Sequence, residues 1–204
     1  AVVGATGNVG REIISILEER KFPIKNLYLL ASSRSKGQQI TFNNKELLVE
    51  DLVDFDFSKV QIGLFSPGGI VSAEYAPKAA KSGCIVIDNT SFFRMHENVP
   101  LIVPEVNGKV LDKFFQKEAE FKIISNPNCS TIQMVIALKP LHDESIINRV
   151  VVSTYQSVSG SGKKGMDELF NQTQNIYTNK PIKKNKFTKQ IAFNVIPHID
   201  DFLE

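Results

Sequence analysis

Tryptophan is absent from this chain of 204 residues, cysteine occurs only twice, and neither sign of charge predominates. Lysine and arginine together number 24 and the acidic residues 22, which gives a formal net charge of +2. So small an excess argues against nucleic acid or an anionic membrane as a partner. No apolar run approaches the roughly 18 residues that span a bilayer, and no basic-then-apolar leader precedes the first strand-like run. We therefore expect a cytoplasmic protein.

The two cysteines, Cys84 and Cys129, are too few for a disulfide framework, which agrees with a reducing compartment. Cys84 begins the continuous apolar run 84–87, a pattern typical of a buried parallel strand. Cys129 instead lies within the segment SNPNCST at 125–131, between an extended run at 121–124 and a helical pattern that starts at Ile132. Its polar neighbours speak against the alternative, a buried and inert thiol.

The turn at Cys129 favours a nucleophile. We expect this thiol in or just before the first helical turn, where free backbone N–H groups and the positive end of the helix dipole stabilise a thiolate. A thiolate attacks a carbonyl carbon, and the same N–H groups, together with the Asn128 amide, would hold the oxyanion that forms.

Three glycines spaced three residues apart, Gly4, Gly7 and Gly10, separate a short apolar run at 1–3 from a helical pattern at 9–20. Strand, glycine turn and helix are the context of a dinucleotide-binding fingerprint. Gly4 and Gly7 would allow the tight turn and the close approach of backbone to a pyrophosphate, and Gly10 would let the helix pack against the sheet. The sequence predicts nucleotide binding here rather than a bare tight turn.

The loop after the second strand-like run favours NADP over NAD. A chain that binds NAD usually offers an acidic residue there to the ribose hydroxyls, and this chain has none. Residues 32–36 read Ser-Ser-Arg-Ser-Lys instead, and such hydroxyls and cations suit a 2′-phosphate. We expect Arg34 and Ser35 to make the contacts, and a solvated basic loop is the alternative.

Alternating patterns predict an α/β fold with a doubly wound, Rossmann-like parallel sheet in an NADP-binding domain at 1–120. Strands are expected at 1–3, 27–30, 60–65 and 84–87, helices at 9–20 and 70–82, and a hairpin at 38–50 around Asn43-Asn44. Residues 121–204 would start a second, incomplete α+β catalytic and dimerisation domain with a strand at 149–155 and a helix at 166–176. The lysine-rich stretch 178–189 is expected to be a solvated loop.

Several motifs in sequence order give the chain a close resemblance to the bacterial aspartate-semialdehyde dehydrogenases. They are GATGNVG at 4–10, ASSRS at 31–35, DNTSFFR at 88–94, VPEVN at 103–107, NPNCST at 126–131, STYQSVSGSG at 153–162 and IAFNVIP at 191–197. Together they are far more specific than any one of them. The resemblance also implies a homodimer built on the second domain.

The resemblance implies reversible, NADP-dependent reductive dephosphorylation of 4-phospho-L-aspartate to aspartate 4-semialdehyde and phosphate, a step toward lysine, diaminopimelate, threonine and methionine. In the family's scheme Cys129 forms an acyl-thioester, Asn128 lies beside it, Gln156 orients the substrate and Arg94 grips the phosphate. The residues carried over for the dinucleotide are Thr6, Gly7, Asn8, Val9, Arg34, Ser35, Ser159 and Gly160. No metal site is implied.

Members of the family run well past a segment resembling 191–204, and that later region supplies a general-base histidine, a substrate-carboxylate arginine and a phosphate-site lysine. None of His96, His142 and His198 fits the role of the base. We therefore expect little or no turnover from these 204 residues alone.

Other interpretations stay open. N-acetyl-glutamyl-phosphate reductase also pairs a glycine turn with a thiol, but its cysteine neighbourhood usually reads Asn-Pro-Gly-Cys, so Asn128 and the run 155–160 favour the aspartate enzyme. Glyceraldehyde-3-phosphate dehydrogenase, which shares the thiol, expects Ala-Ser-Cys-Thr-Thr and an acidic residue for NAD. The alternative from a different class is a truncated, non-catalytic module that binds a nucleotide or forms dimers.

Overall fold

The computed structural model describes residues 1–116 and 122–199. The chain forms two compact units, residues 1–153 and 154–204. The functional domain boundary expected after residue 120 stays a prediction. The two compact units divide later, after residue 153, because the strand at 123–125 pairs with the strand at 85–88 and so belongs to the sheet of the first unit.

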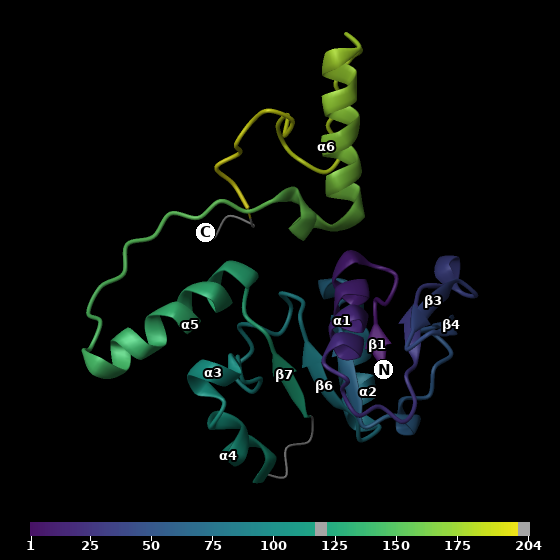
Figure 1. Cartoon of the computed structure of the whole chain (residues 1–204), viewed down its shortest axis with the longest axis vertical. Coiled ribbons are helices and arrows are strands. Elements are labelled where there is room, and N and C mark those ends of the chain that lie inside the picture. The colour runs from purple at the N-terminus through teal and green to yellow at the C-terminus, as the bar shows by residue number, and fades with distance from the viewer. Residues whose placement is uncertain (117–121, 200–204) are drawn as a thin grey trace. The chain divides into compact units, whose positions relative to one another are not determined.

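The first unit is built on a seven-stranded sheet with the strand order β3-β4-β2-β1-β5-β6-β7 (Figure 1). Neighbouring strands pair in parallel except for β3 and β4, which are antiparallel. The chain continues to opposite sides of β1, whose neighbours are β2 and β5, so the doubly wound parallel sheet is confirmed. The strands are β1 (Val2–Val3), β2 (Leu29–Ala31), β3 (Gln39–Phe42), β4 (Lys45–Asp51), β5 (Ile62–Phe65), β6 (Ile85–Asp88) and β7 (Ile123–Ser125).

Helices pack on both faces of this sheet, because successive residues of a strand point to opposite sides. Val2 lies in one buried apolar cluster with Ile14, and Val3 lies in the other with Ala76 and Ala79. The described helices of this unit are α1 (Asn8–Glu19), α2 (Gly69–Lys81), α3 (Pro104–Asn107), α4 (Val110–Gln116) and α5 (Cys129–Glu144). No helix in the described part of the chain is long and apolar enough to cross a membrane.

The expected hairpin is confirmed in β3 and β4. Phe42 pairs with Lys45 across a two-residue turn, and both turn residues have a positive φ, 50° at Asn43 and 60° at Asn44. Asparagine tolerates this left-handed conformation better than most residues, and the turn type matches the twist of the strands.

The second unit contains α6 (Gly162–Tyr177), which begins earlier than the sequence predicts because a short 3-10 turn, Val158–Ser161, leads directly into it. Two buried polar side chains on α6, Glu168 and Gln172, lie one turn apart. The Glu168 carboxylate accepts the backbone N–H groups of residues 185–187, and the Gln172 side-chain oxygen accepts those of residues 191 and 192. These bonds hold the end of the lysine-rich segment and the residues that follow it against α6.

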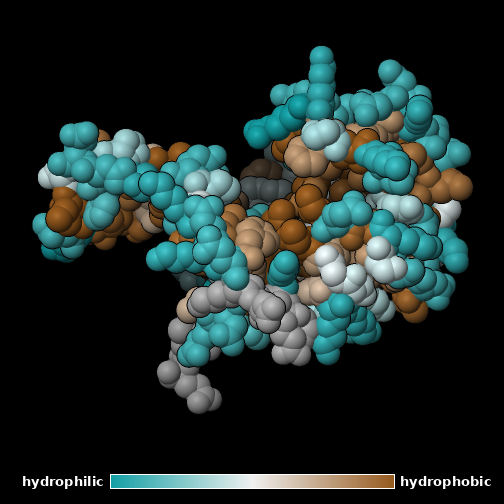
Figure 2. Space-filling view, turned by 90° about the horizontal axis from the view of Figure 1, so that it is seen from below, coloured by the Kyte–Doolittle hydropathy of each residue, from teal (hydrophilic) through white to brown (hydrophobic). Residues whose placement is uncertain are grey.

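The prediction of a strand at 149–155 is wrong, because these residues form no strand. A strand needs a hydrogen-bonded neighbour, and no segment among the described residues pairs with this one. The apolar side chains before and within it stay exposed, among them Leu141, Ile146 and Val151. Figure 2 shows brown, hydrophobic side chains on the projection at the left, the side on which α5 lies in Figure 1.

Cys84, directly before β6, is a core residue as the sequence predicts. It is 0% exposed, and burial raises the pKa of its thiol to about 11 because the thiolate would lose its hydration. Its sulfur would lie 3.2 Å from a Cβ atom at Gly63, so the glycine on β5 makes room for it.

The raised pKa of Cys84 predicts a loss of stability at high pH. The fold favours the neutral thiol, so the contribution of Cys84 is fully present below about pH 9 and is lost as the pH rises through about 11. Between pH 8 and pH 11 we expect the free energy of unfolding to fall by about 2 kcal/mol more in the native sequence than in Cys84→Ala. Urea unfolding of both proteins at the two pH values measures this, and an equal decrease in both would contradict it.

Candidate functional site

The glycine turn after β1 is closely packed. Gly4 has a φ of +85°, and a Cβ atom there would lie 2.7 Å from the Ser66 carbonyl oxygen. A Cβ atom at Gly10 would lie 2.2 Å from the Gly4 carbonyl oxygen, so only glycine lets α1 approach the turn. Gly7 is exposed and caps the start of α1, where first-turn N–H groups are available to an anion. The roles predicted for Gly4 and Gly10 in the turn and the packing are confirmed.

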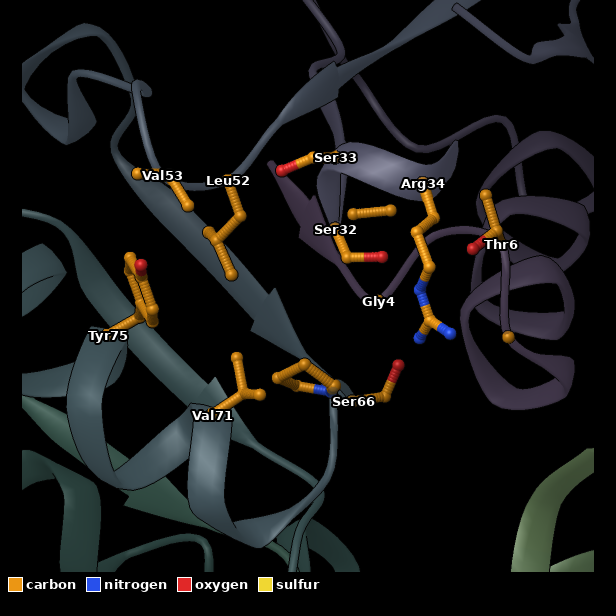
Figure 3. Close-up of a pocket in the computed structure, with 13 residues that line it drawn as sticks. Gly4, Thr6, Ser32, Ser33, Arg34, Leu52, Val53, Ser66, Val71 and Tyr75 are labelled. Atoms are coloured by element: carbon orange, nitrogen blue, oxygen red, sulfur yellow. The ribbon is translucent and has the colours of Figure 1, made fainter. Parts of the chain in front are cut away.

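A cavity of about 430 Å³ opens beside this turn, at the carboxyl ends of β1, β2 and β5 (Figure 3). It lies where the strand order reverses, which is where a doubly wound sheet binds its ligand. Backbone and hydroxyl groups form one side of it and apolar side chains the other. Its lining residues are Gly4, Thr6, Gly7, Ala31, Ser32, Ser33, Arg34, Leu52, Val53, Ser66, Pro67, Val71 and Tyr75.

The basic loop after β2 belongs to this cavity. Residues Ser33–Ser35 form a 3-10 turn, and Figure 3 shows the exposed Arg34 side chain directed between Thr6 and Ser66. The Thr6 hydroxyl donates to the Ser35 hydroxyl over 3.4 Å, which joins the loop to the glycine turn. The structure thus brings together Thr6, Gly7, Arg34 and Ser35. Asn8 and Val9 lie beside them in the first turn of α1 and do not line the cavity.

Asp51, at the end of β4, is a residue that the sequence did not single out. Its carboxylate accepts hydrogen bonds from the Ser33 hydroxyl and from the Val53 N–H, the latter over 3.1 Å, and these bonds lower its pKa, with a smaller contribution from Lys36. Asp51 therefore holds the basic loop in place. Asp51 could have been recognised only from the pairing of β2 with β4, which sets Ala31 opposite Asp51.

Cys129 is exposed and is the first residue of α5, as predicted. Asn128 caps this helix, because its side-chain oxygen accepts from the Ser130 N–H over 3.0 Å and from the Ser130 hydroxyl over 2.7 Å. The Cys129 thiol lies 3.8 Å from the same oxygen. The cap fixes the thiol at the start of α5, where N–H groups of the first turn point outward.

Arg94 lies against the turn that leads to Cys129. Its Nε donates to the Asn126 carbonyl oxygen over 2.9 Å, and its Nη2 donates to the Asn89 carbonyl oxygen over 3.2 Å. The side chain is half-buried. A guanidinium so fixed has N–H donors of the kind that bind oxyanions, and the role of Arg94 toward a phosphate stays a prediction.

The other predicted site residues, Gln156, Ser159 and Gly160, are exposed members of the second unit. The Ser157 hydroxyl accepts from the Ser159 N–H over 3.1 Å and caps the 3-10 turn that contains Ser159 and Gly160. The structure describes these residues within their own unit only, so their roles toward cofactor and substrate stay predictions.

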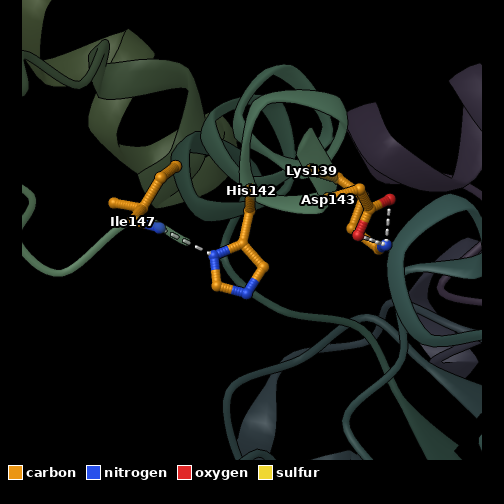
Figure 4. Close-up of polar contacts among 4 residues, drawn as sticks. All are labelled: Lys139, His142, Asp143 and Ile147. Carbon is orange, nitrogen blue, oxygen red and sulfur yellow. Dashed lines mark hydrogen bonds and ion pairs between the residues drawn. The ribbon is translucent and has the colours of Figure 1, made fainter. Parts of the chain in front are cut away.

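The rings of His96 and His142 have defined contacts in the structure. His96 packs against the rings of Phe92 and Phe93, with centroids 5.1 and 5.2 Å away. His142, near the end of α5, accepts the Ile147 N–H at Nδ1 over 3.2 Å, and the ion pair of Lys139 with Asp143, the residue after His142, lies in the same turn of the helix (Figure 4). Among the described residues, no group of three or more His, Cys, Asp or Glu side chains is placed to hold a metal ion.

Two family models match the chain. The NAD binding domain of semialdehyde dehydrogenases matches residues 1–114, and the dimerisation domain of semialdehyde dehydrogenases matches residues 138–204. The first match covers strands β1 to β6, the glycine turn and Arg94. A nucleotide cofactor is thus supported by both the family and the cavity.

The aspartate-semialdehyde dehydrogenase of Legionella pneumophila is 54% identical over 202 residues, which are 99% of this chain and 57% of that protein. A crystal structure of aspartate semialdehyde dehydrogenase II from Vibrio cholerae, complexed with ASA, has a TM-score of 0.93 at 50% identity and matches all of this chain and 59% of its own. The Candida albicans enzyme with NADP has a TM-score of 0.60 at 27% identity, over 72% of this chain and 47% of its own.

This chain thus spans about three fifths of the length of its bacterial relatives, at 57% and 59%. The motifs that suggested the resemblance lie along the matched length, and the resemblance is confirmed. The chain belongs to the semialdehyde dehydrogenase family, and the relatives described here are aspartate-semialdehyde dehydrogenases.

Proposed function

We propose that the protein carries out NADP-dependent reductive dephosphorylation of 4-phospho-L-aspartate to L-aspartate 4-semialdehyde and phosphate, toward lysine, diaminopimelate, threonine and methionine. The observation that carries this proposal is an exposed thiol at the start of α5, next to the turn that Arg94 holds. The turn follows β7, so it lies at the same carboxyl edge of the parallel sheet as the dinucleotide cavity.

The cofactor site fits a dinucleotide phosphate. Gly4 and Gly10 leave no room for a side chain, so backbone alone faces the start of α1, where a pyrophosphate would bind. Arg34 and Ser35 would hold the 2′-phosphate, and no carboxylate ends β2 to repel it. NADPH, when bound, supplies a hydride.

The chemistry on the chain is nucleophilic. The Cys129 thiolate attacks the C4 carbonyl carbon of the acyl phosphate, an S–C bond forms, the C–O bond to phosphate breaks, and phosphate leaves toward Arg94. First-turn N–H groups of α5 and the Asn128 amide hold the oxyanion. Addition of a hydride to the thioester carbon gives a thiohemiacetal, whose C–S bond breaks to release the aldehyde and restore the thiolate. Gln156 orients the substrate.

We also infer a cytoplasmic homodimer. The match of residues 138–204 to a dimerisation domain supports the dimer. The roles of Ser159 and Gly160 toward the dinucleotide belong to the same proposal, as do those of Asn8 and Val9.

Replacing the nucleophile tests the reaction. In the protein expressed from its complete gene, Cys129→Ser should lower kcat/KM by at least about 1,000-fold, because the thioester can no longer form. Mass spectrometry of the native protein mixed with 4-phospho-L-aspartate, without NADPH, should show one aspartyl group on Cys129. Cys84→Ala is the matched control and should keep its activity at 20 °C or below. A thioester that forms only with N-acetyl-L-glutamyl 5-phosphate would contradict the proposed substrate.

Replacing the cation of the basic loop tests the cofactor. Arg34→Gln should raise the Kd for NADPH by about 10- to 100-fold, because one charge-assisted hydrogen bond to the 2′-phosphate is lost, and it should leave the Kd for NADH nearly unchanged. Arg20→Gln, at the opposite end of α1, is the control. Calorimetric titration measures both constants, and tighter binding of NADH than of NADPH by the native protein would refute the assignment.

A further inference from the structure

Two neighbouring loops bring Arg94 and Cys129 to the carboxyl edge of the sheet. Residues 89–94 follow β6, and residues 126–128 follow β7. The two strands are parallel neighbours, and their last residues, Asp88 and Ser125, are partners in the register. Both loops therefore begin at the same level of the sheet.

Two hydrogen bonds join these loops directly, a third joins Asn126 to the end of β6, and a fourth holds Arg94 to Asn89 within the first loop. The Asn126 N–H donates to the Asp88 carbonyl oxygen over 2.8 Å, and the Asn126 side-chain amide donates to the Asn89 side-chain oxygen over 3.4 Å. Arg94 completes the set with its two bonds to the carbonyl oxygens of Asn126 and Asn89. The arginine and the turn before Cys129 are thus parts of one hydrogen-bonded assembly.

A buried carboxylate anchors this assembly to the body of the first unit. Asp88 is 0% exposed, and its oxygens accept from the Ser72 hydroxyl on α2 over 2.7 Å and from the Thr90 hydroxyl over 2.8 Å. The Thr90 N–H donates to it as well, over 3.2 Å. Since a buried carboxylate that loses such partners is costly, the base of the loop 89–94 is held firmly.

Arg94 keeps donors for an anion while it holds the loops. A guanidinium carries five N–H groups, and two of those of Arg94 donate to loop carbonyls within the described residues. A phosphate that binds the other N–H groups is therefore positioned by the same atoms that position the turn before the thiol.

On the basis of the proposed function, we propose that Asn89 and Asn126 are positioning residues, which couple the anion-binding arginine to the nucleophile by joining the loops that carry them. Neither residue has to touch the substrate. Their bonds keep Arg94 and Cys129 at a fixed separation, so that an acyl phosphate held by the arginine presents its carbonyl carbon to the sulfur.

The test uses two alkylating reagents of similar size, one anionic and one neutral, with each rate constant divided by that for a free thiol. Iodoacetate and iodoacetamide both form an S–C bond with Cys129 and release iodide, but only iodoacetate is an anion that Arg94 can attract. The ratio of the two rate constants reports the position of the arginine relative to the thiol. The second readout is the concentration of inorganic phosphate that halves the rate of Cys129 alkylation. Arg94→Gln calibrates the first readout, because it should abolish the preference for iodoacetate.

We expect Asn89→Ala and Asn126→Ala to lower the preference for iodoacetate by about fivefold and to raise the phosphate concentration for half-protection by about tenfold. NADPH affinity should not change, because the dinucleotide cavity lies at other strands. The exposed Asn148→Ala is the matched control and should behave as the native protein. The ratio is insensitive to a general loss of stability, which would affect both reagents alike.

An anion preference within twofold of the native value in both variants, or a native protein without any preference, would overturn the coupling. A decrease that accompanies an equal loss of NADPH affinity would also overturn it, because the variants would then have loosened the whole unit. If the ratio falls as expected but 4-phospho-L-aspartate leaves no aspartyl group on Cys129, the proposed reaction fails and the coupling stands.

Discussion

The parallel pairing of β1, β2, β5, β6 and β7 is the constraint on which the rest of the structure depends. Parallel strands share one carboxyl edge, so the loops that follow them meet there even though they are far apart in the sequence. The glycine turn follows β1, the basic loop follows β2, and the loops with Arg94 and Cys129 follow β6 and β7. If these five strands ran in mixed directions, the groups would lie at two opposite edges, and no common site would form.

The two cysteines show how position in this architecture decides the chemistry of a side chain. Cys84 precedes a strand and lies inside the apolar core, where burial raises the pKa of its thiol to about 11. Cys129 follows a strand and opens a helix, so its sulfur is exposed beside backbone N–H groups. The same residue type is therefore a packing element at one end of the sheet and a candidate nucleophile at the other.

Sequence reasoning succeeded where the signal is local. The strands of the sheet, helices α1 and α2, the turn at Asn43-Asn44 and the helix that starts at Cys129 follow from periodicity and turn chemistry over a few residues, whereas the short helices α3 and α4 were not predicted. It failed where the structure or role of a residue depends on a partner that is distant in the sequence. Asp51 acquires its role through the register of β2 with β4, and the strand-like run 149–155 forms no strand because no described segment pairs with it.

The lysine-rich segment after α6 shows a further limit of composition as a guide. Its charge predicted a solvated loop, and Lys183, Lys184 and Lys186 are indeed exposed. Its backbone is nevertheless held in place, because Glu168 accepts three of its N–H groups and Gln172 accepts those of residues 191 and 192, just beyond it. A carboxylate buried without a cation is tolerable when several N–H donors satisfy it. Solvated side chains and a fixed backbone are therefore compatible, and the order of this segment depends on two polar residues of α6 that no charge count reveals.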